Sequence, residues 1–281
     1  MKRVYLLAHP AGHSVSPAMH NAAFAHLGLE FRYEALDVSP QRLGEAVELL
    51  RGEGVAGANV TIPHKQAVMS MLDRISVEAK AVGAVNTIIA DGGTLSGHNT
   101  DAAGFLKALS DDAKLSVKDK RTLILGAGGA ARAVAYALVI SGAKVAIHNR
   151  TEERARSLIR DFGRLGELTL VEHAALAEAV RSADLLVNTT SVGMQAPEGD
   201  GDKEESPLQS GTLPENGLVC DLVYRPMETR LLREAKRDGL PVLDGLPMLV
   251  YQGAIAFELW TARAAPVEVM LEAAKRELAV G

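Results

Sequence analysis

A glycine-rich turn between an apolar strand and a helix is the feature that most restricts the fold of this chain. Residues 126–131 read Gly-Ala-Gly-Gly-Ala-Ala and fit the pattern G-x-G-x-x-A, after the apolar run 122–125 and before a helical stretch. Gly126 permits the tight turn, Gly128 lets the backbone approach a pyrophosphate, and Ala131 allows close helix packing. Because the helix N-terminus offers free N–H groups to phosphates, the pattern predicts a dinucleotide site.

The strand after this turn favours NADP over NAD. In an NAD site that strand, residues 144–147, would lead to an Asp or Glu that binds the ribose 2′-hydroxyl. Here Asn149, Arg150 and Thr151 follow it, and Arg154 comes one helical turn later. Guanidinium groups match a 2′-phosphate that a carboxylate would repel, so we expect the arginines to bind it. The alternatives are a glycine turn that serves packing alone and a solvated basic helix start.

Composition and charge indicate a globular chain, allow an enzyme without selecting one, and favour small molecules as ligands. The 281 residues suit one or two domains, and 47% hydrophobic residues are ample for a packed core. A net charge of −5 with scattered Lys and Arg argues against a nucleic-acid partner. Cys220 is the only cysteine, which fits a reducing compartment, so the cytoplasm is the expected location. No stretch is long enough to span a membrane, and we expect no metal.

The N-terminal part of the chain alternates strand-like and helical patterns, which predicts a mainly parallel α/β fold. The expected strands are 4–8, 31–38, 55–60 and 85–90, and the expected helices are 17–27, 40–51 and 63–72. Asp91, Gly92 and Gly93 predict a hairpin turn, and hence at least one antiparallel pair of strands. The charged stretch 116–121 is a candidate domain boundary, and the acidic segment 196–207 is typical of a solvated loop.

Lys65 occupies an unexpected position in the segment NVTIPHK, residues 59–65. Pro63 suits the first position of a helix, so Lys65 would lie in its first turn, against the positive end of the helix dipole. A nearby carboxylate would offset that penalty, and Asp101 in the segment HNTD is the candidate. Such a pair could donate and accept a proton next to a bound hydroxyl or carbonyl. The simpler role of Asp101 is to cap the helix that follows it.

A second anion site is predicted in the segment HSVSPAMHN, residues 13–21. Ser16 precedes a proline and suits a helix N-cap, whereas Ser14 has no such role. Two hydroxyls beside a helix N-terminus can bind a carboxylate. Asn59 and Asn86 interrupt strand-like runs, which suggests hydrogen bonds to polar ligand atoms; capping of turns is the alternative.

Together these segments resemble the shikimate dehydrogenase family nearly end to end. The resemblance is carried by HSVSPAMHN, NVTIPHK, GAVNT, NTDAAGF, GAGGAARA, NRT, NTTSVGM, DLVYRPMETRLL and GLPMLVYQGAIAFELWT. It implies reversible, NADPH-dependent reduction of 3-dehydroshikimate to shikimate, in aromatic amino-acid biosynthesis, within a two-domain α/β fold. A quinate or dual-specificity enzyme is the alternative. A methylenetetrahydrofolate dehydrogenase lacks the paired serines, and a non-catalytic NADP-binding module gives no reason for the lysine.

The resemblance also implies site residues and domain limits. Lys65 and Asp101 would be the catalytic pair. The substrate, with its carboxylate on the two serines, would contact Ser14, Ser16, Asn59, Thr61, Asn86, Tyr224 and Gln252. NADP would contact Gly126, Ala127, Gly128, Gly129, Ala130, Asn149, Arg150, Thr151, Arg154, Thr189, Ser191, Val192, Gly193, Met194, Leu222 and Gly245. Residues 1–101 and 241–281 would form the substrate domain, and residues 102–240 a Rossmann-type NADP domain, in a monomer or homodimer.

Overall fold

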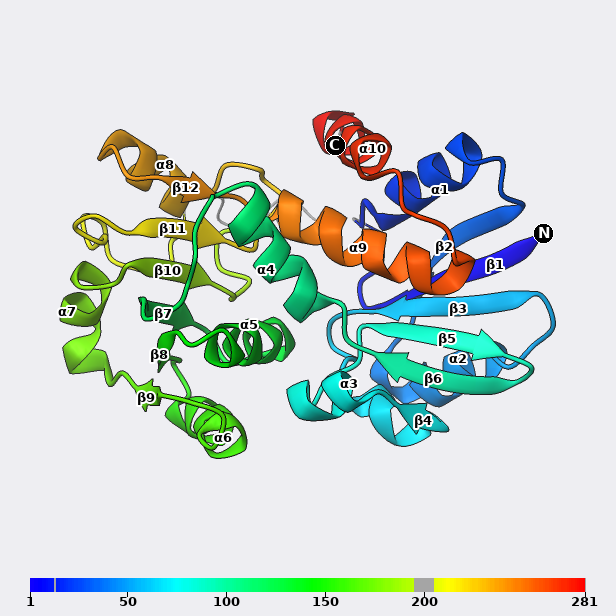
Figure 1. The fold of residues 1–281 in the computed structure, drawn as a ribbon, viewed down its shortest axis with the longest axis horizontal. Helices are drawn as coiled ribbons and strands as arrows, with labels where there is room; N and C mark the ends of the chain where they lie inside the picture. Colours follow the sequence, from blue (N-terminus) through cyan, green and yellow to red (C-terminus); the bar gives the residue numbers. More distant parts are fainter. Residues whose placement is uncertain (13, 195–204, 281) are drawn as a thin grey trace. The chain divides into compact units, whose positions relative to one another are not determined.

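The structure is a computed structural model that describes residues 1–12, 14–194 and 205–280. It divides into two compact units, of which the first comprises Met1–Gly104 and Leu249–Gly281 and the second comprises Phe105–Met248. The chain passes from one unit to the other inside helix α4 (Asp101–Asp111) and inside helix α9 (Leu246–Thr261) (Figure 1).

One predicted segment falls differently in the structure, and most of another lies outside the described residues. The charged stretch 116–121 lies within the second unit, after its first residues, because the boundary falls inside a continuous helix rather than in a loop. Of the predicted acidic loop 196–207, residues 196–204 lie outside the described residues.

The first unit is built on a six-stranded mixed sheet in the order β2-β1-β3-β5-β6-β4. Its strands are β1 (Lys2–Ala8), β2 (Phe31–Asp37), β3 (Val55–Val60), β4 (Arg74–Ile75), β5 (Thr87–Asp91) and β6 (Thr94–His98). Strand β1 is parallel to β2 and β3, whereas β5 is antiparallel to β3 and β6. Gly92 and Gly93 form the β5–β6 turn with φ angles of 54° and 81°, so the predicted hairpin is confirmed.

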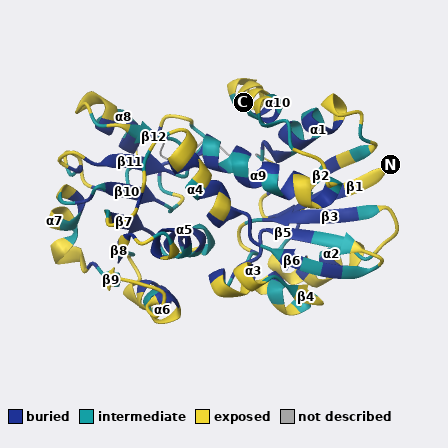
Figure 2. Ribbon diagram, in the orientation of Figure 1, coloured by how far each residue is buried: buried dark blue, intermediate teal, exposed yellow. Residues whose placement is uncertain are grey.

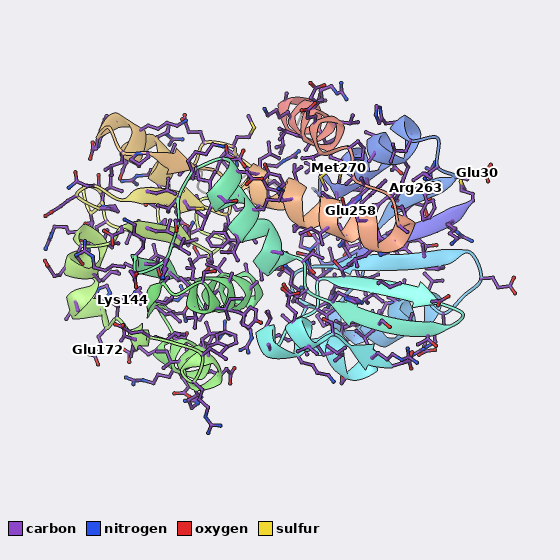
Figure 3. The ribbon with its side chains drawn as sticks, viewed as in Figure 1. Glu30, Lys144, Glu172, Glu258, Arg263 and Met270 are labelled. Carbon is purple, nitrogen blue, oxygen red and sulfur yellow. The ribbon has the colours of Figure 1, made fainter. Side chains whose placement is uncertain are left out.

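Helices pack on both faces of this sheet because side chains alternate along each strand. The helical elements are α1 (Ser16–His26), η1 (Pro40–Arg42), α2 (Leu43–Leu49), η2 (Ala67–Met71), α3 (Val77–Val82), α9 and α10 (Val267–Val280). Tyr5 and Leu7 of β1 pack in one cluster with Val47 of α2. On the opposite face Tyr33, the register partner of Val4, stacks on the ring of His20 in α1. Helix α10 packs against α1 and buries Met270, which is labelled in Figure 3.

The second unit is a doubly wound sheet in the order β12-β11-β10-β7-β8-β9, and every strand pair is parallel. Its strands are β7 (Arg121–Leu125), β8 (Lys144–His148), β9 (Leu168–Leu170), β10 (Leu185–Asn188), β11 (Leu218–Asp221) and β12 (Val242–Leu243). Its helices are α5 (Gly129–Ile140), α6 (Glu152–Phe162), η3 (His173–Ala175), α7 (Leu176–Arg181) and α8 (Arg230–Arg237). The strands are mostly buried, and exposed residues gather on the outer helix faces (Figure 2). The predicted α/β fold is confirmed.

Candidate active site

The residues that the first unit supplies to the predicted substrate site gather at one edge of its sheet. Leu7 and Val60 are register partners near the carboxyl ends of the parallel strands β1 and β3. Thr87, at the start of the antiparallel strand β5, pairs with Asn59 of β3 and with His98 of β6. The segments that follow β1, β3 and β6 therefore meet the segment that precedes β5. These segments carry Ser14, Thr61, Lys65, Asn86 and Asp101.

The predicted helix 63–72 is wrong, because Lys65 lies in a turn and only the 3₁₀ helix η2 follows. The Lys65 carbonyl accepts a hydrogen bond from the N–H of Val85 at 2.8 Å. In an α-helix that carbonyl would bond to the N–H four residues later, so a tertiary hydrogen bond replaces the helical one. Lys65 therefore precedes the short 3₁₀ helix η2 and does not lie in the first turn of an α-helix, so the penalty argued for that position does not apply.

Lys65 is instead paired with the carboxylate of Asp101. Lys65 Nζ lies 2.6 Å from Asp101 Oδ2, and the two side chains are only 15% and 6% exposed. Asp101 Oδ1 accepts a hydrogen bond from Asn86 Nδ2 at 2.8 Å. Among the described residues Asp101 is the only side-chain partner of the ammonium group, which keeps two N–H donors for a ligand. The pair can thus hold a proton donor in a fixed orientation.

Asn86 connects this ion pair to two other segments. Its Nδ2 lies 2.8 Å from Thr100 Oγ1 and 3.2 Å from Gln252 Oε1, so its two hydrogens are shared among these acceptors and Asp101. Its Oδ1 accepts from the N–H of Thr100 at 2.8 Å. Gln252 reaches this position on α9, whose backbone approaches α4 closely. A β-carbon at Gly104 would lie 2.7 Å from the Gln252 nitrogen, so only glycine permits this approach.

Asn99, rather than Asp101, caps helix α4. Asn99 Oδ1 accepts hydrogen bonds from the N–H groups of Asp101 at 3.1 Å and of Ala102 at 3.3 Å. Asp101 is the first residue of the helix, where the dipole favours a carboxylate. The capping role considered for Asp101 is therefore performed by its neighbour, and the Asp101 carboxylate is left for Lys65.

The two serines lie at the start of α1, but the predicted N-cap role of Ser16 is wrong. The N-cap residue is Val15, and no side chain caps the helix. Ser14 Oγ accepts a hydrogen bond from the N–H of Ser16 at 3.2 Å. Within the described part of the chain, the hydroxyls of Ser16 and Thr61 form no hydrogen bond with protein, which leaves both for a ligand.

Asn59 is held by a set of hydrogen bonds of its own. Its Nδ2 donates to the Asn86 carbonyl and to Thr87 Oγ1, both at 3.1 Å, and its Oδ1 accepts from Tyr33 Oη at 2.8 Å. Asn59 is 6% exposed. The Asn59 side chain is therefore fixed near the carboxyl end of β3, beside Asn86 and hence beside the ion pair.

In the second unit the predicted glycine turn follows β7, next to β10, where the strand order reverses. Gly126 has a φ of 112°, and a β-carbon there would lie 2.6 Å from Thr189 Oγ1, so only glycine fits. Helix α5 begins after its N-cap Gly128 without a side-chain cap. Its first N–H groups are thus open to an anion, at the switch point where ligands of such sheets bind.

The arginines after β8 differ in their partners. Arg156 and Arg160 of α6 pair with Glu152 and Glu153, which compensates their charge. Arg150 and Arg154 are exposed, and in the described ranges neither forms an ion pair. Their guanidinium groups are therefore free to bind a phosphate. They follow β8, which is the neighbour of β7, the strand before the glycine turn.

The remaining residues predicted for the cofactor follow β10, β11 and β12 at the same carboxyl edge. They are Thr189, Ser191, Val192, Gly193, Met194, Leu222 and Gly245. Gly245 lies against the Leu222 carbonyl, where a β-carbon would overlap the oxygen, so these two positions are in close contact. Tyr224, the one residue predicted for the substrate in the second unit, also follows β11.

A buried carboxylate links these segments. Asp221 is 0% exposed and accepts hydrogen bonds from Asn188 Nδ2 at 2.9 Å, the Val223 N–H at 3.1 Å and Thr229 Oγ1 at 2.7 Å. Burial raises the pKa of Asp221 from 3.8 to about 6, although the three hydrogen bonds act in the opposite direction. Asp221 therefore joins the ends of β10 and β11 to the start of α8.

Sequence reasoning missed several residues of these networks. They are Tyr33, Thr87, Asn99, Thr100, Asn188 and Asp221. Four of them directly adjoin a predicted site residue, as Thr87 adjoins Asn86 and Thr100 adjoins Asp101. The signal that could have found these four is that each is a polar residue next to a predicted site residue in the sequence. Tyr33 carried no such signal, because it reaches Asn59 only through the pairing of strands.

Comparison with known proteins shows that nearly the whole chain is similar in sequence to members of one family. The family described as Shikimate dehydrogenase substrate binding domain matches residues 6–88. Shikimate / quinate 5-dehydrogenase matches residues 108–197, and Shikimate 5′-dehydrogenase C-terminal domain matches residues 245–275. The curated shikimate dehydrogenase (NADP(+)) of Symbiobacterium thermophilum is 48% identical over 280 residues, which cover 96% of this chain and 92% of the relative.

Solved structures show the same similarity in three dimensions. Shikimate 5-dehydrogenase from Thermus thermophilus, in complex with NADP(H) and shikimate, matches with a TM-score of 0.88 and 46% identity over 99% of this chain and 100% of that one. Quinate dehydrogenase from Corynebacterium glutamicum, in complex with NAD, matches with a TM-score of 0.87 and 32% identity over 97% and 98% of the two chains. Within the described residues no helix is long and apolar enough to cross a membrane.

Proposed function

Because the chain belongs to the shikimate dehydrogenase family, we propose that it catalyses the reversible NADPH-dependent reduction of 3-dehydroshikimate to shikimate. The observation that carries this proposal is the shielded Lys65–Asp101 ion pair, joined through Asn86 to Gln252 at the sheet edge that also carries the two serines. This places a proton donor among several neutral hydrogen-bonding groups, as a polyhydroxylated ring requires. A role in aromatic amino-acid biosynthesis follows from that reaction.

The ion pair would handle the proton. During reduction the Lys65 ammonium donates a proton to the carbonyl oxygen of the substrate, and in the reverse reaction neutral Lys65 removes the hydroxyl proton. Asp101 holds Nζ at 2.6 Å and fixes its direction, while Asn86 fixes the orientation of the Asp101 carboxylate. Asp101 thus orients the donor and Lys65 performs the transfer.

The neutral groups would bind the rest of the substrate. The hydroxyls of Ser14 and Ser16, beside the uncapped start of α1, suit a carboxylate. The polar side chains at the sheet edge suit the ring hydroxyls. The residues that we assign to these hydroxyls are Asn59, Thr61, Asn86 and Gln252, with Tyr224 from the second unit.

The second unit fits NADP. The uncapped start of α5 and the glycine turn suit the pyrophosphate, and the unpaired Arg150 and Arg154 suit the 2′-phosphate. When bound, NADPH supplies the hydride. We assign the adenosine side to Asn149, Arg150, Thr151 and Arg154, and the nicotinamide side to the segments after β10, β11 and β12. A cytoplasmic location and a monomeric or homodimeric state stay predictions.

Quinate is the second candidate substrate, since a quinate dehydrogenase of the same fold matches at 32% identity. The unpaired Arg150 and Arg154, which follow β8, favour NADP. The shikimate assignment is favoured by the higher identity of 48% to a curated shikimate dehydrogenase (NADP(+)).

The deciding experiment follows absorbance of the reduced cofactor with purified protein, supplying shikimate or quinate together with NADP⁺ or NAD⁺. We expect the highest kcat/KM with shikimate and NADP⁺. Equal or greater kcat/KM with quinate would replace the proposed substrate, and no turnover of either compound would refute the proposed function.

A further inference from the structure

The orientation of the Asn59 amide is determined by its neighbours. The Asn86 carbonyl is a backbone oxygen and can only accept, so Nδ2 of Asn59 must face it. Oδ1 therefore faces Tyr33, and the Tyr33 hydroxyl must be the donor of the 2.8 Å hydrogen bond. Both Nδ2 hydrogens are used, by the Asn86 carbonyl and by Thr87 Oγ1. The free hydrogen-bonding capacity of Asn59 is thus one lone pair on Oδ1, which can only accept.

Tyr33 is itself held from two sides by α1. It lies on β2, one of the two edge strands of the sheet, whose outer backbone groups pair with no strand among the described residues. Asn21 pairs with them: its Nδ2 donates to the Tyr33 carbonyl at 2.9 Å, and its Oδ1 accepts from the Tyr33 N–H at 2.8 Å. Asn21 thereby replaces the missing strand and fixes the backbone of Tyr33.

His20 holds the ring of Tyr33. The two rings are stacked with centroids 4.5 Å apart and planes 7° apart, and the edge of Trp260 packs against His20. Complete burial lowers the pKa of His20 to about 3, so the imidazole that stacks on Tyr33 is uncharged at neutral pH. The Tyr33 hydroxyl has little freedom to turn away from Asn59.

We propose that Tyr33 is a positioning residue for the substrate site, because its hydroxyl holds Asn59 Oδ1 in the place where the free lone pair accepts a hydrogen bond from one ring hydroxyl. This inference rests on the proposed function. Without the Tyr33 hydroxyl, Asn59 Oδ1 loses its fixed partner. The amide is still held at Nδ2 by the Asn86 carbonyl and Thr87 Oγ1, but it can tilt, which moves its free lone pair away from the substrate hydroxyl. The loss falls on substrate binding, because the Tyr33 hydroxyl donates to Asn59 and not to the Lys65–Asp101 pair.

The test is Tyr33→Phe, which keeps the stacked ring and removes only the hydroxyl. Tyr5→Phe is the matched control, since Tyr5 is a buried tyrosine of the adjacent strand β1 whose hydroxyl forms no hydrogen bond within the described residues. We expect Tyr33→Phe to raise the KM for shikimate roughly three- to tenfold, the scale of one hydrogen bond. In Tyr33→Phe, kcat and the KM for NADP⁺ should change less than about twofold. In Tyr5→Phe, kcat and both KM values should change less than about twofold.

A second measurement separates positioning from a structural role. In an Asn59→Ala background, Tyr33→Phe should cause no further rise in the KM for shikimate, because its effect passes through Asn59. An unchanged KM for shikimate, a further rise in that background, or a Tyr33→Phe protein that fails to fold or loses kcat and NADP⁺ affinity alike would each overturn the inference. Lack of wild-type turnover would instead refute the proposed function.

Discussion

Replacing Lys65 with Met separates the chemical role of the ammonium group from its structural role. The variant keeps most of the aliphatic stem and removes the proton donor. Among the described residues no other cationic side chain pairs with Asp101 and could replace it. We expect kcat to fall at least about a hundredfold, the scale of general acid–base catalysis, with a smaller effect on the KM for shikimate.

The same substitution should also destabilise the fold, by an amount that the burial of the pair sets. Asp101, with a side chain 6% exposed, would keep only the Asn86 amide as a side-chain partner within the described residues. Breaking a fully buried pair costs about 3–5 kcal/mol, and the 15% exposure of Lys65 admits some water, so we expect about 1–3 kcal/mol. The control is Lys107→Met, because Lys107 Nζ lies 2.6 Å from Asp111 but the side chains are 48% and 43% exposed. Its loss should be no more than about 0.5 kcal/mol.

Urea unfolding at neutral pH and steady-state kinetics measure the two effects. The double variant Lys65→Met/Asp101→Asn removes the uncompensated charge, so it should recover most of the stability while remaining inactive. The reasoning is wrong if Lys65→Met raises KM with unchanged kcat, which would make Lys65 a substrate anchor, or if the double variant is no more stable than the single one.

Three further variants test other parts of the molecule. Arg150→Ala should weaken NADP⁺ binding roughly ten- to a hundredfold and leave NAD⁺ unaffected, whereas Arg156→Ala, whose arginine is already paired with a carboxylate, should change neither; titration of both cofactors decides this. Ser14→Ala should weaken shikimate binding by about 1–3 kcal/mol without altering NADP⁺ binding, and equal losses for both ligands in calorimetry would contradict it. Asp221 has a folded pKa raised to about 6, so its stabilising contribution is complete below about pH 3.8 and is lost as pH rises through about 6. Between about pH 5 and 7.5 the wild type should lose about 1 kcal/mol of unfolding free energy relative to Asp221→Asn, and a constant difference between the two unfolding curves would refute the assignment.

Much of the fold follows from local pattern. The apolar run, the glycine turn and the helix after it are adjacent in sequence, so the βαβ unit around Gly126 was predictable from covalent neighbours alone. The hairpin at Gly92 and Gly93 was predictable for the same reason, since two consecutive positive φ angles favour glycine. The absence of a carboxylate after residues 144–147 is likewise a local fact, and it indicates NADP without any knowledge of tertiary contacts.

Local reasoning failed where a tertiary contact competes with it. Pro63 indicated a helix start, but the Lys65 carbonyl bonds to the N–H of Val85, and that bond prevents the helix. Asp101 and Asn99 are both acceptable caps for one helix, and propensity does not choose between them. The choice follows from the position of Lys65, which engages the Asp101 carboxylate and leaves capping to Asn99.

The sequence by itself determined which side chains are available: a lysine, a carboxylate, amides and hydroxyls in short polar segments, and a glycine turn for a dinucleotide. Only the tertiary structure decided which of them meet. Lys65 and Asp101 are 36 positions apart, and Asn86 and Gln252 are 166 apart. Separations of that length carry no local signal, because strand order and register and the close approach of α4 and α9 at Gly104 bring these groups within hydrogen-bond distance.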